Sequence, residues 1–214
     1  MSLLTNFQSV EDKIDTAFRY SYSIVNHQGL YRSLEYIEGT GTQYINTNVP
    51  GNAIYGLEFK YIPVALAFSW VATIGCTRDN FTLGQPLNNT LYLRWRTEEV
   101  FNGVSVSINS INTFKILNNK ISLNDHSWSR NTSLSIDTTS KVLSIFRDTD
   151  MSDAAMAKIK FYELTLYAVD NITVTHKYIP VKRSGDNAIG LYDLITNEFL
   201  NNAGTGTFIA GPEI

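Results

Sequence analysis

From about Leu34 onward, apolar and polar residues alternate with a period of two. The stretch 57–62, LEFKYI, places Leu57, Phe59 and Tyr61 on one face and charged residues on the other. In a strand successive side chains point to opposite faces, so this alternation predicts strands with one buried face. The same alternation recurs in three further stretches: 91–96, 104–108 and 121–123.

Two other stretches, 141–146 and 158–169, carry apolar residues on both faces, which is typical of strands in the middle of a sheet. Asn, Asp, Gly and Ser turns separate about a dozen short strands, and only 152–158 has a composition that could turn helically. Strands at this spacing without helices between them predict an all-β fold, an antiparallel sandwich or barrel.

The first 28 residues follow a different period. Apolar residues recur at steps of four and three, and Ser9 and Asp12 resemble a capping box. This pattern predicts a short amphipathic N-terminal helix whose seam contains Leu3, Phe7, Val10, Ile14 and Ala17. A helix this short is not stable alone in water. We therefore expect it to pack on partner chains, on another protein or on its own domain.

We therefore expect two parts: residues 1–30 as a helical anchor or oligomerisation segment, and residues 31–214 as a β-sandwich domain. Phe7 is bulky for a two-stranded coiled coil, which favours a wider bundle such as a trimer.

The segment 190–208, GLYDLITNEFLNNAGTGTF, predicts a strand, a tight turn, a second strand and a glycine corner. The Asp193 carboxylate is expected to accept hydrogen bonds from the turn, and Asn197 is expected to adopt the left-handed conformation. Gly-Thr-Gly-Thr occurs at 204–207 and also at 39–42. Two neighbouring strands at the ends of the fold would explain this pair, and chance is the alternative.

Composition narrows the classes of partner. The net charge is −3 and the pI is near 5.6, with scattered basic residues, which argues against nucleic acid as a partner. The single cysteine, Cys76, cannot form an internal disulfide and is expected to be a small buried residue. The N-terminus has no signal-peptide pattern, and no stretch approaches the about 18 apolar residues of a membrane span. We expect a protein that folds in the cytoplasm without membrane insertion.

Catalysis is not expected. A glycoside hydrolase needs two carboxyl groups across a cleft, whereas Glu98 and Glu99 are adjacent and Glu163 is alone in its strand. We interpret these glutamates as surface charge and the protein as a non-enzyme.

No cofactor is expected either. The three histidines, His27, His126 and His176, lie far apart in the sequence and predict scattered solvent-facing imidazoles rather than a metal site. The stretch DTDMSD offers oxygen ligands for Ca²⁺ from Asp148, Asp150 and Asp153. It lacks the glycine and the distal glutamate of a calcium loop, which favours a solvated turn.

Glycan contact is the remaining chemistry, because sugars stack on exposed aromatic rings beside polar side chains. The stretch 124–131, NDHSWSRN, predicts a polar loop that holds Trp128 with Asp125, His126 and Arg130. A second group shares the outward face of one strand: Tyr92, Arg94 and Arg96. The alternative is that Trp128 caps the edge of the core and that the arginines pair with nearby glutamates.

The ends of the chain carry a resemblance. LEYIEGTGTQYINTNV (34–49), YIPV (178–181) and the GLYD…GTGTF segment resemble the two ends of laminin-G-like, concanavalin-A-like jelly-roll domains. The resemblance covers about residues 34–212, and the middle, 63–140, is poorly matched. Thr196-Asn197 replaces the usual Thr-Gly of the turn.

Domains of this kind are common in virion proteins of tailed bacteriophages and in surface proteins of gut bacteria. The resemblance implies a jelly-roll fold and a structural or accessory virion protein, a fibre-like appendage on head, tail or baseplate. Its expected partners are its own copies, other virion proteins and a host-surface glycan. The missing signal peptide favours assembly into a virion in the host cytoplasm. The alternatives are a secreted carbohydrate-binding or adhesin module and a glucanase-like hydrolase.

Overall fold

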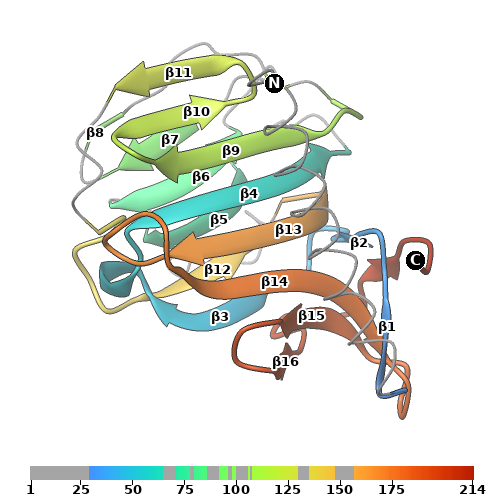
Figure 1. Ribbon diagram of the computed structural model, residues 1–214. Helices are drawn as coiled ribbons and strands as arrows, with labels where there is room; N and C mark the ends of the chain where they lie inside the picture. Colours follow the sequence, from blue (N-terminus) through green and yellow to red (C-terminus); the bar gives the residue numbers. More distant parts are fainter. Residues whose placement is uncertain are drawn as a thin grey trace, which may run out of the picture.

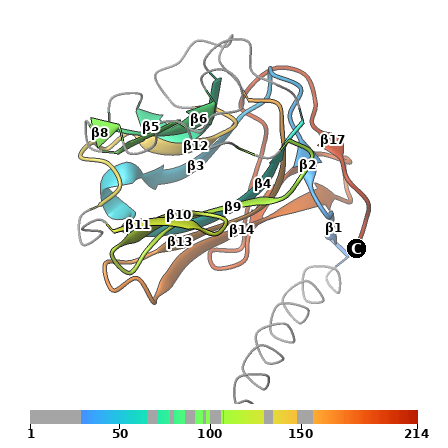
Figure 2. The same cartoon turned by 90° about the horizontal axis from the view of Figure 1, so that it is seen from above.

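The structure of the chain is a computed structural model. Its described residues are 29–64, 71–77, 80–85, 92–95, 98–99, 106, 108–129, 135–147 and 157–214. Their strands form two sheets that lie face to face (Figures 1 and 2), and every strand pairing among them is antiparallel. The prediction of an all-β antiparallel sandwich is therefore confirmed.

The large sheet has eleven strands. Its main path runs in the order β11 (His126–Ser129), β10 (Lys120–Leu123), β9 (Asn112–Leu117), β4 (Gly56–Pro63), β13 (Ile159–Tyr167), β14 (Val174–Arg183), β15 (Ile189–Asp193) and β16 (Glu198–Leu200). Three short strands join it at one end: β1 (Tyr31–Ser33) on β14, β2 (Ile37–Glu38) on β13, and β17 (Ile209–Ala210) on β2.

The small sheet has six strands. They run in the order β3 (Ile45–Pro50), β12 (Val142–Ile145), β5 (Val71–Thr77), β6 (Phe81–Gln85), β7 (Tyr92–Trp95) and β8 (Glu98–Glu99). A single 3₁₀ turn, η1 (Gly51–Ala53), follows β3 in the described part of the chain.

Alternating side chains build the core between the two sheets. Leu57, Phe59 and Tyr61 on β4 are fully buried, as their spacing predicts. The strands with apolar residues on both faces are internal, since β13 lies between β4 and β14 and β12 lies between β3 and β5. Cys76 is fully buried in the core, which confirms its prediction.

The two Gly-Thr-Gly-Thr segments lie side by side. Thr205 N donates to Thr42 O at 2.9 Å, and Thr42 Oγ1 donates to Thr205 O at 3.0 Å. A Cβ on Gly204 would lie 2.2 Å from the Thr42 oxygen, so this close approach requires glycine. The prediction that the first and last parts of the sandwich are neighbours is confirmed, and β2 pairs with β17 just beyond this contact.

The turn after β15 has the predicted construction. Asp193 Oδ1 accepts from Ile195 N at 3.0 Å, Asp193 Oδ2 accepts from Thr196 Oγ1 at 3.0 Å, and Asn197 has φ 61°. Asp193 is also buried and meets two further donors: Lys177 N at 3.0 Å and His176 Nδ1 at 2.6 Å. This one carboxylate therefore ties the turn to β14.

Several predictions fall outside the described residues. These include the N-terminal helix, its seam residues Leu3, Phe7, Val10, Ile14 and Ala17, and residues 152–156 of the stretch 152–158, whose last two residues are described and are not helical. Within the described ranges, no helix has the length and apolarity needed to cross a membrane.

Candidate functional site: a polar row on the small sheet

Strand register aligns one small or polar residue from each of five strands of the small sheet. Asn46 on β3 is opposite Ser144 on β12, which is opposite Gly75 on β5. Gly75 is opposite Thr82 on β6, which is opposite Arg94 on β7. We call these five residues the polar row.

The polar row points away from the core. The adjacent register consists of residues that are all fully buried in the core: Ile45, Ile145, Ile74, Leu83 and Leu93. Directly opposed residues share a face and successive residues take opposite faces, so the polar row lies on the outer face of the small sheet.

Hydrogen bonds order the row from within the sheet. Ser144 Oγ donates to Asn46 Oδ1 at 2.8 Å, and Thr82 Oγ1 donates to Thr77 O at 2.9 Å. Ser144 and Thr82 are fully buried, whereas Asn46 and Arg94 are partly exposed. The two ends of the row, Asn46 and Arg94, are therefore the parts that solvent reaches.

The expected group on β7 lies at one end of this row. Tyr92 and Arg94 are half-buried and alternate with the buried Leu93 and Trp95, so their predicted outward orientation is confirmed. Arg96 lies outside the described residues. The register also places Glu99 opposite Arg94.

The prediction that Trp128 lies in a polar loop is wrong. Trp128 lies on the edge strand β11, opposite the fully buried Ile121, and packs against the core. Because opposed residues share a face, Trp128 faces the interior of the sandwich, which is the core-capping alternative. Asp125 is exposed in the turn before β11, and Arg130 lies outside the described residues.

The structure does not bring the two predicted groups together. Trp128 belongs to the inner face of the large sheet, whereas Tyr92 and Arg94 belong to the outer face of the small sheet. Sequence reasoning also missed Asn46, Ser144, Gly75 and Thr82. The available signal was the alternation within INTNV (45–49), FTLG (81–84) and VLSI (142–145).

Glu163 is not a surface charge, which corrects the sequence interpretation. It is 7% exposed on the outer face of the large sheet, and its carboxylate oxygens lie 3.4 Å from Lys60 Nζ and 3.6 Å from Lys177 Nζ. Lys115 Nζ lies 3.2 Å from Glu58 Oε1 on the same face. Burial lowers the pKa of Lys177, while the charge of Glu163 opposes that shift. Four strands supply these charges, β4, β9, β13 and β14, so the sequence of a single strand does not reveal the cluster.

The histidines behave differently from one another. His126 is exposed, as predicted, but the His176 side chain is only 24% exposed and is held by Asp193, so the scattered, solvent-facing interpretation is wrong for His176. His27 and the aspartates Asp148, Asp150 and Asp153 lie outside the described residues. In the part of the chain that the structure covers, no three metal-ligating side chains gather.

No protein-family model matches the chain, and no curated protein matches it. Function is therefore inferred from the residue patterns and the geometry of the two sheets.

Proposed function

We propose that this chain is a structural or accessory protein of a tailed-bacteriophage virion. In this proposal residues 1–30 attach or oligomerise the chain, and the sandwich, a lectin-like jelly roll, is displayed outward on head, tail or baseplate. The resemblance of residues 34–212 to jelly-roll domains of virion proteins supports the proposal. A host-surface glycan is the proposed ligand.

One observation carries the proposal: the first described residues and the polar row are on different sides of the sandwich. Figure 2 shows β1 and the C-terminus beside the large sheet, with the small sheet forming the opposite layer. The polar row lies on the outer face of that opposite layer. Attachment through the N-terminal segment would therefore leave the polar row directed outward.

The chemistry of the row supports binding rather than hydrolysis. Its two partly exposed end residues supply an amide, from Asn46, and a guanidinium, from Arg94, which are groups that hydrogen-bond sugar hydroxyls. None of the five is a carboxylate, whereas glycoside hydrolysis needs two. Tyr92 lies two residues from Arg94 on the same face of β7 and adds an aromatic ring at the end of the row.

A glycan array probed with the full chain tests the ligand. We expect Arg94→Ala and Tyr92→Ala each to weaken binding at least about tenfold, the loss of one good polar or stacking contact, while the melting temperature changes little. Lys120→Ala, on an exposed position of the large sheet, is the matched control and should bind like the parent. Equal binding by all three variants would reject the polar row as the glycan site.

Immunogold electron microscopy distinguishes the proposed virion protein from the alternative, a secreted module of a bacterium. Antibodies raised against the sandwich should label phage particles released by lysis of cultures that produce the protein. Label confined to the bacterial surface would instead support the secreted carbohydrate-binding or adhesin module.

A further inference from the structure

The two ends of the described chain are held together beside β1. Leu34 forms a bridge with Glu213, and Ile214 N donates to Ser33 O at 3.1 Å. Ser184 N donates to Leu30 O at 2.8 Å, which adds the turn after β14 to the same place. The surface from which residues 1–28 depart is therefore built from three separate segments.

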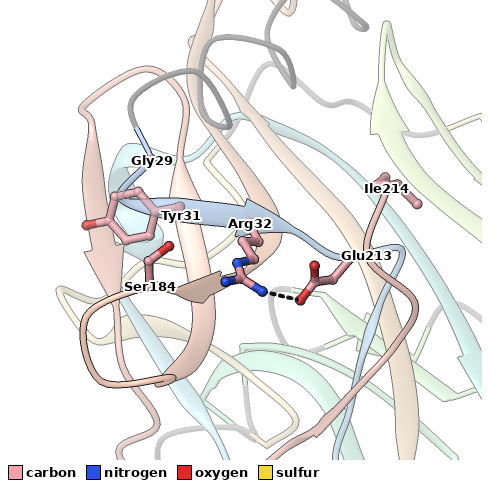
Figure 3. A pocket seen from close by; sticks show the side chains of 6 residues that line it. All are labelled: Gly29, Tyr31, Arg32, Ser184, Glu213 and Ile214. Carbon is pink, nitrogen blue, oxygen red and sulfur yellow. Dashed lines mark hydrogen bonds and ion pairs between the residues drawn. The ribbon is translucent and has the colours of Figure 1, made fainter.

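This surface contains a hollow of about 450 Å³ lined by Gly29, Tyr31, Arg32, Ser184, Glu213 and Ile214. Figure 3 shows the Arg32 and Glu213 side chains directed toward each other, with Arg32 Nη1 3.3 Å from Glu213 Oε1. Both members of this ion pair are about half-exposed, so they can also meet charges from outside the chain. We call the hollow together with Leu30 the terminal surface.

Two large apolar side chains are exposed on the terminal surface. Leu30 is 58% exposed and Ile214 is 60% exposed. Single exposed apolar residues are ordinary, but these two lie on segments joined by direct hydrogen bonds around a hollow. Exposed apolar residues beside charges of both signs match the mixed composition of a protein contact.

We propose that the terminal surface contacts a second copy of this chain. This inference rests on the proposed function, in which the seam residues assemble the N-terminal segments. The four-three spacing of the seam continues past Ala17 through Ser21 to Ile24, which is five residues before Gly29. Five residues of extended chain span at most about 18 Å. Chains joined along the stripe must therefore bring their terminal surfaces close to a shared axis.

In a ring of copies the interface is heterologous: one part of each terminal surface contacts a different part of the terminal surface of the neighbouring copy. The Leu30 side of one copy then packs against the Ile214 side of the next. Arg32 and Glu213 carry opposite charges, so the rim of one copy complements the rim of its neighbour. The occupant of this surface is thus a copy of the same chain, and the contact would orient the displayed sandwiches around the axis.

Disulfide cross-linking of the full chain tests the contact. The native Cys76 is buried, so an introduced surface cysteine dominates the reaction. Ile214→Cys, mixed with Leu30→Cys chains, is the probe, because the proposed contact places these two positions of neighbouring copies together. Ile172→Cys is the matched control, because Ile172 is 78% exposed and lies before the start of β14, whereas Ser184 follows its end. Ten strand residues separate the two ends by about 33 Å. Under mild oxidation the Ile214→Cys variant, mixed with Leu30→Cys chains, should form linked dimers at least tenfold faster than the Ile172→Cys variant mixed with the same chains.

The outcomes distinguish the two proposals. A parent chain whose solution mass is that of an assembly, with equal cross-linking rates for the two cysteine variants, would overturn the terminal contact and leave assembly by the N-terminal segment standing. A parent chain with the mass of a monomer would overturn both. As a second measurement, Ile214→Asp should raise the dissociation constant of the assembly at least tenfold, and Ile172→Asp should leave it unchanged.

Discussion

On the large sheet, Glu163 is almost fully buried within salt-bridge distance of two lysines, and Asp193 is buried against four hydrogen-bond donors. On the outer face of the small sheet, the polar row consists of neutral side chains of modest size and one arginine at its end. In both sheets polar residues alternate with apolar residues along the strands. Buried carboxylates link strands of the large sheet to one another, whereas the polar row contains no carboxylate.

The difference shows how to separate structural polar residues from candidate binding residues. A buried carboxylate that loses its partners or leaves donors unpaired destabilises the fold, because the remaining groups stay away from water. A partly exposed amide or guanidinium keeps access to water and is available to a ligand. Substitutions on the large sheet should therefore affect stability most, and substitutions on the polar row should affect binding most.

The largest loss of stability is expected for Asp193→Ala. In the structure four donors contact this carboxylate. At about 1 kcal/mol for each hydrogen bond, the free energy of unfolding of the variant should be about 4 kcal/mol lower than that of the parent. Urea unfolding measures this loss. Asp170→Ala is the matched control, since Asp170 organises a similar turn from an exposed position and should lose far less. Equal losses would show that the buried links to β14 contribute nothing.

The contribution of Asp193 should also depend on pH. Burial opposes ionisation, but the hydrogen bonds from His176, from the Ile195 and Lys177 amides and from Thr196 outweigh it and lower the pKa of Asp193. In the unfolded chain an aspartate has a pKa of about 3.9. The stabilisation is thus complete above about pH 5 and is lost as the pH falls through the folded pKa, since the unfolded state then binds the proton more tightly. The difference in stability between the parent and Asp193→Asn should shrink below about pH 4.

Glu163→Ala is expected to lower the free energy of unfolding by about 3 kcal/mol. This is the lower end of the loss for a broken buried ion pair, because both lysines retain some exposure. Thermal and urea unfolding of the variant provide the measurement. Asp186→Ala removes the exposed partner of Arg183 and should change stability little. If the two variants were equally stable, the outer face of the large sheet would be no more structural than an ordinary surface.

Trp128→Ala should destabilise the fold by about 2 kcal/mol, roughly half the loss for a fully buried tryptophan, because the ring packs on the core from an edge strand. Glycan binding should be unchanged, since this ring faces the interior of the sandwich. Asp125→Ala, in the exposed turn before β11, is the control and should retain both properties. Loss of glycan binding without loss of stability would restore Trp128 to the binding site.

The smallest stability effect, about 1 kcal/mol for one hydrogen bond, is expected for Ser144→Ala. Ser135→Ala is the matched control and should lose a similar free energy of unfolding, because Ser135 is also buried and donates to Asp137 O at 2.8 Å. Only Ser144→Ala should weaken glycan binding, through misplacement of the Asn46 amide. Identical glycan binding by both serine variants would limit the binding site to the Arg94 end of the row.

Local sequence determined the elements whose physical cause is local. The period of two placed Leu57, Phe59 and Tyr61 in the core, because a strand cannot turn successive side chains to the same face. Asp193 and Asn197 predicted their turn, because its hydrogen bonds and left-handed φ involve residues within four positions of each other. These features are encoded in a few neighbouring residues.

Tertiary structure alone decided what depends on the register between distant strands. Trp128 was expected in a loop, but pairing with Ile121 turned it toward the core. Glu163 looked isolated because its lysines come from β4 and β14, and the polar row joins residues as far apart in the chain as Asn46 and Ser144. Alternation tells which residues share a face of one strand, but a shift of one residue in pairing changes every cross-strand neighbour. The site therefore exists only once the sheets are assembled.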